Sequence, residues 1–343
     1  GGINMLLKKL SEAAGVSSNE NEVRDIIKKE IEDKVDSFRT DVMGNLIAVK
    51  GENKKGPKMM LAAHMDEIGL MITAIEKNGL LKFRPVGGID KRVLVSKPVF
   101  VGEKKVKGVI GAKAIHLQKP AERKKPIPYS NLYIDIGADS KDEAKKSVSK
   151  GDFVTFNTKF SQLGINHAKG KAFDDRVGCA ALIDLLKYDY DFPVYAVFAV
   201  QEEVGLRGAA RAAYDIDPDL ALVVEGTSAS DVPETDEHGY STTVDKGPAL
   251  TVMDSSVIAS KKILQGLTNT AEENDIPYQY RRANVGGTDA GKINLTREGI
   301  PAAVVSLPCR YIHSPVSLIS LTDYDYLKEL LKSYLHQLNK EEF

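Results

Sequence analysis

The chain contains no tryptophan, and this absence argues against a protein that binds long sugar chains on stacked aromatic rings. It has only two cysteines, Cys179 and Cys309, too few for a disulfide framework in 343 residues. We expect both to be reduced thiols with structural or incidental roles in a cytoplasmic protein. No apolar run approaches the ~20 residues that cross a bilayer. The first residues also lack the basic and apolar regions of a signal peptide.

Net charge is also almost absent, because 47 Lys and Arg residues face 48 Asp and Glu residues. A formal charge of −1 gives no electrostatic reason to expect nucleic acid or an anionic membrane as a partner. It also provides little repulsion against self-association, so an oligomer stays open. Apolar residues make up 42% of the chain, and 343 residues suit one large domain with a smaller one.

The N-terminal part reads as a helix followed by strands. Ser17 and Glu20 fit a capping box, and apolar residues then recur at helical spacing as far as Val35. The run 59–63 is apolar throughout, as in a strand buried on both faces of a sheet, and it ends at His64.

The middle of the chain, residues 72–163, has a different character. Short β-prone pieces alternate there with Gly and Pro turns, which predicts a small β-domain or barrel. From Asp174 onward strands and helices alternate again, with helices expected near 176–187, 256–273 and 322–338. We therefore predict an α/β fold with a mainly parallel sheet flanked by helices. Residues 1–71 and 164–343 form its catalytic domain, and residues 72–163 form an inserted β-barrel-like domain.

Functional groups follow the apolar strands at the ends where open α/β sheets bind ligands. Five separate segments deliver histidine or carboxylate groups there, namely His64 with Asp66, the pair Asp174 and Asp175, the pair Glu202 and Glu203, Glu225, and His313. Each group alone has an ordinary explanation. Asp174 and Asp175, for example, could simply complement the dipole of the helix that they open. Together they are harder to dismiss, because clustered carboxylates repel unless a cation or protons neutralise them. Nitrogen and oxygen ligands of this kind suit Zn²⁺, Co²⁺ or Mn²⁺.

In this order the motifs resemble the dinuclear metallo-aminopeptidases that include tetrahedral, deblocking and glutamyl aminopeptidases, some of which carry an endoglucanase label. The matching segments cover nearly the whole chain and are His64-Met65-Asp66, Asp174-Asp175-Arg176, Glu202-Glu203-Val204-Gly205, Glu225, His313-Ser314, Gly286-Gly287-Thr288-Asp289-Ala290-Gly291 and Gly108-Val109-Ile110-Gly111. The resemblance implies two divalent metal ions per subunit, zinc or cobalt or else manganese, and removal of N-terminal residues from short peptides.

Residue roles follow from the same resemblance. Asp174 would bridge both metals and precede an unusual, often cis, peptide bond to Asp175. Glu203 and His313 would complete one metal, whereas His64 and Glu225 would complete the other. Glu202 would be the general base, and Asp66 would orient the ring of His64. Many relatives have Asp where this chain has Glu225, which leaves metal preference at that position open.

Substrate recognition and assembly complete these expectations. We expect Arg281, Gly287, Thr288 and Asp289 to bind substrate. Arg281 and Arg282 lie close in sequence to the loop 286–291, and they would form a basic pocket for acidic side chains. These two arginines are equally compatible with a surface or an interface. The resemblance also implies a homo-oligomer, from a dimer to a dodecamer, that is built through the inserted domain.

Three other functions compete with this hypothesis. A glycoside hydrolase would use two of the carboxylates but leaves His64 and His313 without a role. A deacylase or dipeptidase would use the same metal centre. A silent metal-binding scaffold would not need Glu202. His116, His167, His238 and His336 are interpreted as ordinary histidines, and His336 is expected to face outward on the last helix.

Overall fold

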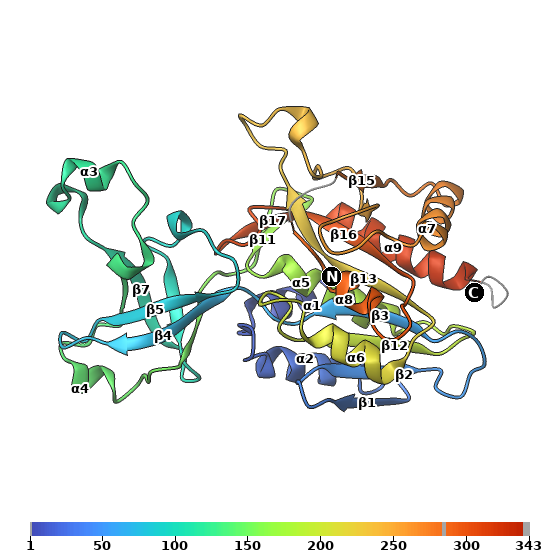
Figure 1. Cartoon of the computed structure of the whole chain (residues 1–343), viewed down its shortest axis with the longest axis horizontal. Coiled ribbons are helices and arrows are strands. Elements are labelled where there is room, and N and C mark those ends of the chain that lie inside the picture. The colour runs from blue at the N-terminus through green and yellow to red at the C-terminus, as the bar shows by residue number, and fades with distance from the viewer. Residues whose placement is uncertain (1, 283–285, 339–343) are drawn as a thin grey trace.

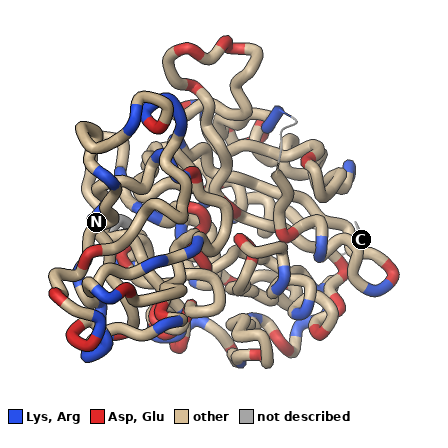
Figure 2. The backbone as a smooth tube through the Cα atoms, turned by 60° about the vertical axis from the view of Figure 1, so that its left-hand side comes forward, with Lys and Arg blue, Asp and Glu red and all other residues tan. Residues whose placement is uncertain are grey.

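A computed structural model describes residues 2–282 and 286–338, with side chains from residue 5 onward. Figure 1 shows an α/β part around a large sheet, and a β-barrel that stands beside it on the left. Basic and acidic residues are interspersed over the side of the molecule that Figure 2 shows. Over the described ranges, none of the helices is long and apolar enough to cross a membrane.

The large sheet comprises eleven strands in the described ranges. They are β1 Ser37–Thr40, β2 Leu46–Lys50, β3 Met59–His64, β10 Ser161–Leu163, β11 His167–Gly170, β12 Val194–Ala199, β13 Leu220–Ala229, β14 Ala249–Thr251, β15 Gln279–Arg281, β16 Ala302–Arg310 and β17 Ser317–Ser320. The central strands β12, β3, β13 and β16 are parallel, whereas β2 and β17 join them antiparallel on either side. The central strands are mainly apolar because helices cover both faces of the sheet.

Helices cover the two faces unequally. One face packs against α1 Gly2–Glu12, α2 Asn21–Ile31, α5 Phe173–Leu185, α7 Lys261–Glu273 and α9 Leu321–Gln337, and this side holds the larger hydrophobic core. The other face packs against the short helices α6 Gly208–Ile216 and α8 Asp289–Asn294. The predicted helices are confirmed, but α7 begins later than expected. The carboxylate of Asp254 accepts hydrogen bonds from the amides of Ser256 and Val257, which holds that segment in a turn.

The barrel closes in the strand order β4-β5-β8-β7-β6-β9 and has its own apolar core. Its strands are β4 Gly69–Ile75, β5 Leu81–Val86, β6 Pro98–Val101, β7 Val106–Ala112, β8 Leu132–Asp135 and β9 Phe153–Phe156, with the short helices α3 Pro120–Arg123 and α4 Lys141–Ala144 on its outside. The predicted α/β fold with an inserted barrel is confirmed. The barrel strands begin at Gly69, and β10, at residues 161–163, already belongs to the large sheet.

The predicted capping box at Ser17 and Glu20 is wrong. Helix α2 begins at Asn21, its cap residue is Glu20, and no side chain caps its first turn. The hydroxyl of Ser17 instead donates a hydrogen bond to Asp66, in the loop after β3. The local sequence spacing favours a helix cap at Ser17. It carries no information about Asp66, which lies 49 residues further along the chain.

Candidate metal centre

The carboxyl ends of the central strands bring the predicted residues to one edge of the sheet. His64 is the last residue of β3 and pairs in register with Ala199 at the end of β12, just before Glu202 and Glu203. Glu225 lies in β13, the neighbour of β3 on its other side. Asp174 lies in the first turn of α5, and His313 lies in the turn between β16 and β17.

Asp174 lies between the two histidines. Its Oδ1 is 3.2 Å from Nε2 of His64, whereas its Oδ2 is 3.4 Å from Nε2 of His313. The peptide bond from Asp174 to Asp175 is cis, as the resemblance implied. Gly226 in β13 allows this close approach, since a Cβ atom there would lie 3.0 Å from Cβ of Asp174. One carboxylate thus presents each oxygen to a different imidazole.

Glu203 completes a compact group with Asp174 and His313. Its Oε2 lies 3.3 Å from Nε2 of His313, and one ligand atom from each of the three residues falls within 4.8 Å of the others. In the described part of the chain this is the one group of three His, Cys, Asp or Glu side chains with that spacing. His64 and Glu225 therefore do not form an equally tight group with Asp174.

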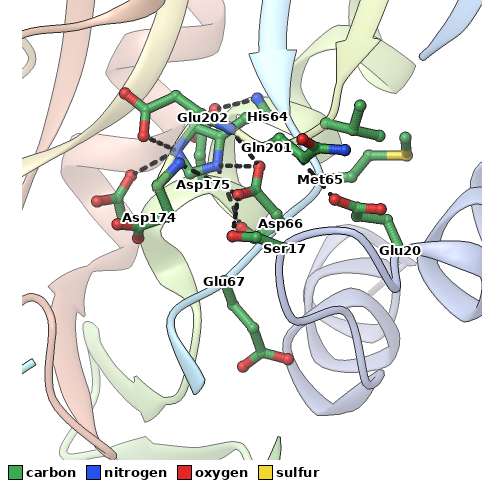
Figure 3. A network of polar contacts seen from close by, with 12 residues as sticks. Ser17, Glu20, His64, Met65, Asp66, Glu67, Asp174, Asp175, Gln201 and Glu202 are labelled. Carbon is green, nitrogen blue, oxygen red and sulfur yellow. Dashed lines mark hydrogen bonds and ion pairs between the residues drawn. The ribbon is translucent and has the colours of Figure 1, made fainter. Parts of the chain in front are cut away.

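His64 is held from its other side by Asp66 (Figure 3). Its Nδ1 lies 3.1 Å from the main-chain oxygen and 3.4 Å from Oδ1 of Asp66, and its main-chain amide donates to Asp175. The carboxylate of Asp66 also accepts hydrogen bonds from the amides of Glu202 and Glu203, at 3.0 and 3.1 Å. Asp66 thereby ties the end of β3 to the loop after β12. The side chain of Glu202 reaches back to within 3.9 Å of Nε2 of His64.

Burial of several acidic groups together strongly affects their pKa values. Burial, with repulsion from neighbouring carboxylates, raises the pKa of Glu225 and Glu202 well above the usual range and that of Glu203 to about 8. Burial lowers the pKa of His313, but its contacts with Asp174 and Glu203 outweigh that effect and raise it to about 9. Such a site holds several protons unless a cation replaces them. The donor set therefore fits divalent metal ions.

The barrel side of the molecule also touches this centre. After β5, Gly87 and Gly88 pass so close that added Cβ atoms would lie 3.4 Å from Cβ of Glu203 and 3.6 Å from Nδ1 of His313. Sequence reasoning missed these two glycines. The adjacent pair Gly87-Gly88 at the end of a β-prone run is the one signal that marks them.

The predicted substrate-binding residues lie around the start of α8. Asp289 is buried, its Oδ1 has no hydrogen-bond partner, and burial raises its pKa to about 7. The hydroxyl of Thr288 also lacks a partner, and Gly287 packs against Ser256. The negative charge of Asp289 is one of the neighbouring charges that raise the pKa of Glu202.

The two arginines of the predicted basic pocket differ. Arg281 is buried in β15, so it is not a surface arginine. Its Nη1 lies 3.8 Å from Oδ2 of Asp254, and its Nε and Nη1 have no hydrogen-bond partner. Arg282 is exposed and donates to the main-chain oxygen of Glu237. Of these two arginines, Arg281 is the buried one whose guanidinium group has unsatisfied donors.

The two cysteines and the other four histidines do not belong to the compact group of Asp174, Glu203 and His313. Cys179 and Cys309 are free and buried, and burial raises the pKa of Cys309 to about 12. His167 pairs with Asp245, and His336 is exposed on α9, as predicted, where its ring lies against Tyr188 and Tyr190. His116 and His238 lie in short 3₁₀ turns, the first between β7 and β8 of the barrel and the second between β13 and β14.

Imidazoles and carboxylates gathered at the carboxyl edge of an α/β sheet are typical of metal-dependent hydrolases. A family profile described as M42 glutamyl aminopeptidase matches residues 44–330, so the chain belongs to the M42 glutamyl aminopeptidase family. It is an aminopeptidase, a hydrolase that acts on peptide bonds. The predicted family is thereby confirmed.

Individual relatives agree with this assignment. The chain is 34% identical over 347 residues to the lysyl aminopeptidase of Pyrococcus furiosus, covering 98% of both chains. Its structure resembles that of aminopeptidase APDkam598 from Desulfurococcus kamchatkensis, with a TM-score of 0.96, 38% identity and coverage of 100% and 96%. It also resembles a Thermotoga maritima structure named endoglucanase, with a TM-score of 0.81, 42% identity and 96% coverage of each chain.

One similar structure is informative about assembly. The TET1 peptidase of Pyrococcus horikoshii, which can assemble into a tetrahedron or a large octahedral shell, matches with a TM-score of 0.88 and 35% identity. This match covers 98% of the present chain and 100% of that one.

Proposed function

We propose that the chain removes N-terminal residues from short peptides with two divalent metal ions, zinc or cobalt or else manganese. Asp174 would bridge the two ions, Glu203 and His313 would hold one, and His64 and Glu225 would hold the other. The observation that carries this proposal is the placement of Asp174, whose two oxygens face different histidines at 3.2 and 3.4 Å. When bound, the ions would polarise the scissile carbonyl and make a water molecule more acidic.

Glu202 is the proposed general base. Its main-chain amide is fixed by Asp66, and its side chain lies at the rim of the cluster within 3.9 Å of His64. Burial raises the pKa of its carboxyl group, which suits a group that accepts a proton and later donates it to the leaving amine. Asp66 is the proposed orienting residue for His64, since it lies on the Nδ1 side of the ring.

Asp289 is the proposed anchor for the α-ammonium group of the substrate. The support is its unpaired Oδ1, together with the unpaired hydroxyl of Thr288 and the side-chain-free Gly287 that precede it in the chain. Arg281 is the proposed determinant of acidic side-chain preference, because its buried guanidinium group has donors to spare. The family description names glutamyl aminopeptidase, whereas the Pyrococcus furiosus relative is a lysyl aminopeptidase.

The inserted domain, predicted as residues 72–163, is the proposed assembly module, and the predicted residues 1–71 and 164–343 are the proposed catalytic domain. We set their boundaries so that β4, from Gly69, belongs to the barrel and β10, at residues 161–163, belongs to the large sheet. The barrel exposes Val109, Ile115 and Leu117, which are apolar side chains that a partner subunit would cover. The shells formed by the Pyrococcus horikoshii relative support a homo-oligomer, from dimer to dodecamer. A stable monomer in sedimentation would contradict this. The two free thiols support a cytoplasmic location.

A panel of aminoacyl chromogenic substrates tests the proposal. We expect hydrolysis that a chelator abolishes and that added Zn²⁺, Co²⁺ or Mn²⁺ restores. Glycoside hydrolysis is a second candidate activity, because the similar Thermotoga maritima structure is named endoglucanase. That activity would survive the chelator, since two carboxylates suffice for it. A deacylase or dipeptidase would be chelator-sensitive but would reject aminoacyl substrates.

A further inference from the structure

The link between α1 and α2, residues 15–20, lies alongside the loop that follows β3. We call this link the N-terminal clamp. The amide of Glu67 donates to the oxygen of Gly15 at 2.9 Å, and the amide of Ser17 donates to the oxygen of Glu67 at 3.4 Å. Gly15 allows no side chain, since a Cβ atom there would lie 2.5 Å from the guanidinium group of Arg176. The clamp is therefore fixed against residues 65–67.

Ser17 makes the shortest contact of the clamp with the metal centre. Its Oγ donates to Oδ2 of Asp66 at 2.6 Å, and the two residues are only 2% and 0% exposed. The same carboxylate accepts from the amides of Glu202 and Glu203 and faces Nδ1 of His64. Figure 3 shows Ser17 and His64 on different sides of Asp66. Ser17 thus contacts the group that connects the proposed base to the proposed ligands.

Glu20 gives the clamp a second contact with the same region. Its Oε1 accepts from the amide of Ser18 at 2.7 Å and from that of Gln201 at 3.3 Å. Gln201 immediately precedes Glu202 and has a left-handed backbone, with φ of 58°. The clamp therefore touches both strand ends that carry proposed catalytic groups, β3 through Asp66 and β12 through Gln201.

The hydroxyl of Ser17 does not cap α2, so helix capping does not explain why this polar group is buried here. Without it, Oδ2 of Asp66 would keep a single donor, the amide of Glu203, at 3.1 Å in a site without solvent contact. A buried carboxylate that loses a hydrogen-bond donor either rotates towards another donor or becomes less stable in its charged form. Rotation would release the amides of Glu202 and Glu203 and change the support of His64.

We propose that Ser17 is a positioning residue for the peptidase reaction. Through its hydrogen bond it holds Asp66 in the orientation that aligns Glu202, Glu203 and His64. This inference rests on the proposed function, because it assigns Ser17 to the support of that same metal centre. Ser17 lies outside the part of the chain that the family profile matches, which is residues 44–330.

The test compares Ser17→Ala with Ser11→Ala in the full chain. Ser11 lies in α1, is fully buried, and donates a bond of 2.7 Å to the main-chain oxygen of Lys171, so its loss affects packing without touching Asp66. Changes to groups that orient metal ligands lower activity or metal affinity about 10–100-fold. We expect S17A to lower kcat about tenfold with KM within about twofold of wild type. It should also weaken Zn²⁺ binding, measured by competition with a chromogenic chelator, about tenfold.

The control should keep kcat and Zn²⁺ affinity within about twofold of wild type, even where its melting temperature falls as far as that of S17A. Unchanged kcat and Zn²⁺ affinity in S17A, or equal losses in S11A, would overturn the inference. If S17A does not fold, Ser17→Cys keeps the shape of the side chain with a slightly larger atom and a weaker donor, and the same comparison with S11A decides. A wild-type protein without metal-dependent activity would refute the proposed function instead, whatever S17A does.

Discussion

Glu67 and Lys171 form a salt bridge in which both side chains are only 2% exposed. Nζ of Lys171 lies 2.6 Å from Oε1 and 2.8 Å from Oε2 of Glu67, and it also donates to the main-chain oxygen of Ala13. Arg176 joins from α5 with Nη2 3.4 Å from Glu67, while its Nε donates to the main-chain oxygen of Met65. This buried group connects the segments that follow α1 and β3 to the start of α5.

Loss of Lys171 should destabilise the protein strongly. Replacing it with Met leaves Glu67 buried with a weakened set of partners, and breaking a buried pair costs about 3–5 kcal/mol. The matched control is Lys9→Met, which breaks the exposed pair with Glu30 at 3.1 Å and costs about 1 kcal/mol or less. Thermal unfolding followed by circular dichroism measures both. Equal melting temperatures for the two variants would show that the buried pair contributes no more than a surface pair.

Glu202→Gln should separate catalysis from metal binding. The amide side chain keeps the size of Glu202 but cannot accept the proton, and general-base catalysis contributes about 10²–10⁴-fold to the rate. We expect kcat to fall by that factor while elemental analysis finds the wild-type metal content. Turnover within about tenfold of wild type would remove Glu202 from the role of base.

His64→Ala and His313→Ala should each lower metal content, because each removes a proposed ligand from a different ion. His167→Ala is the control, since that imidazole pairs with Asp245 at the edge of the sheet. The measurement is inductively coupled plasma mass spectrometry of the purified proteins. We expect the control to keep its metal and each ligand variant to lose one equivalent or more. Two full equivalents in both ligand variants would refute the proposed ligand set.

Metal binding should release protons and strengthen as the pH rises from about 7 to 9. Without a cation, Glu203 has a pKa of about 8 and His313 a pKa of about 9, so both are largely protonated at pH 7. Ligands must lose their protons to bind a metal, and therefore the apparent affinity falls as the pH falls through these values. Calorimetric titration in buffers of different ionisation enthalpy counts the released protons. An affinity that does not change over this range would contradict the protonated resting state.

Much of the fold followed from the sequence because its strands are buried on both faces. Continuous apolar runs such as 59–63 are typical of such strands. The polar residue after each run then marks the functional edge, which placed His64 and the pair Glu202 and Glu203 correctly. The antiparallel strands β10, β11 and β17 on one side of the sheet were not predicted, since each has only three or four residues.

The support of the site was much harder to predict than its ligands. Ser17 was read as a helix cap, because a serine three residues before a glutamate has that meaning locally. Lys171 and Arg176 were assigned no role, since charged residues are rarely buried and only the fold shows their partner Glu67. Contacts between segments 50 to 160 residues apart depend on topology, and local periodicity does not encode them.

Anomalous X-ray diffraction from crystals grown with Zn²⁺ or Co²⁺ tests the central claim most directly. The account predicts two anomalous peaks per subunit, one on each side of the Asp174 carboxylate. Glu203 and His313 should lie about 2 Å from one peak, and His64 and Glu225 about 2 Å from the other. A single peak, or two peaks that do not share Asp174, would contradict a dinuclear centre held by these five residues.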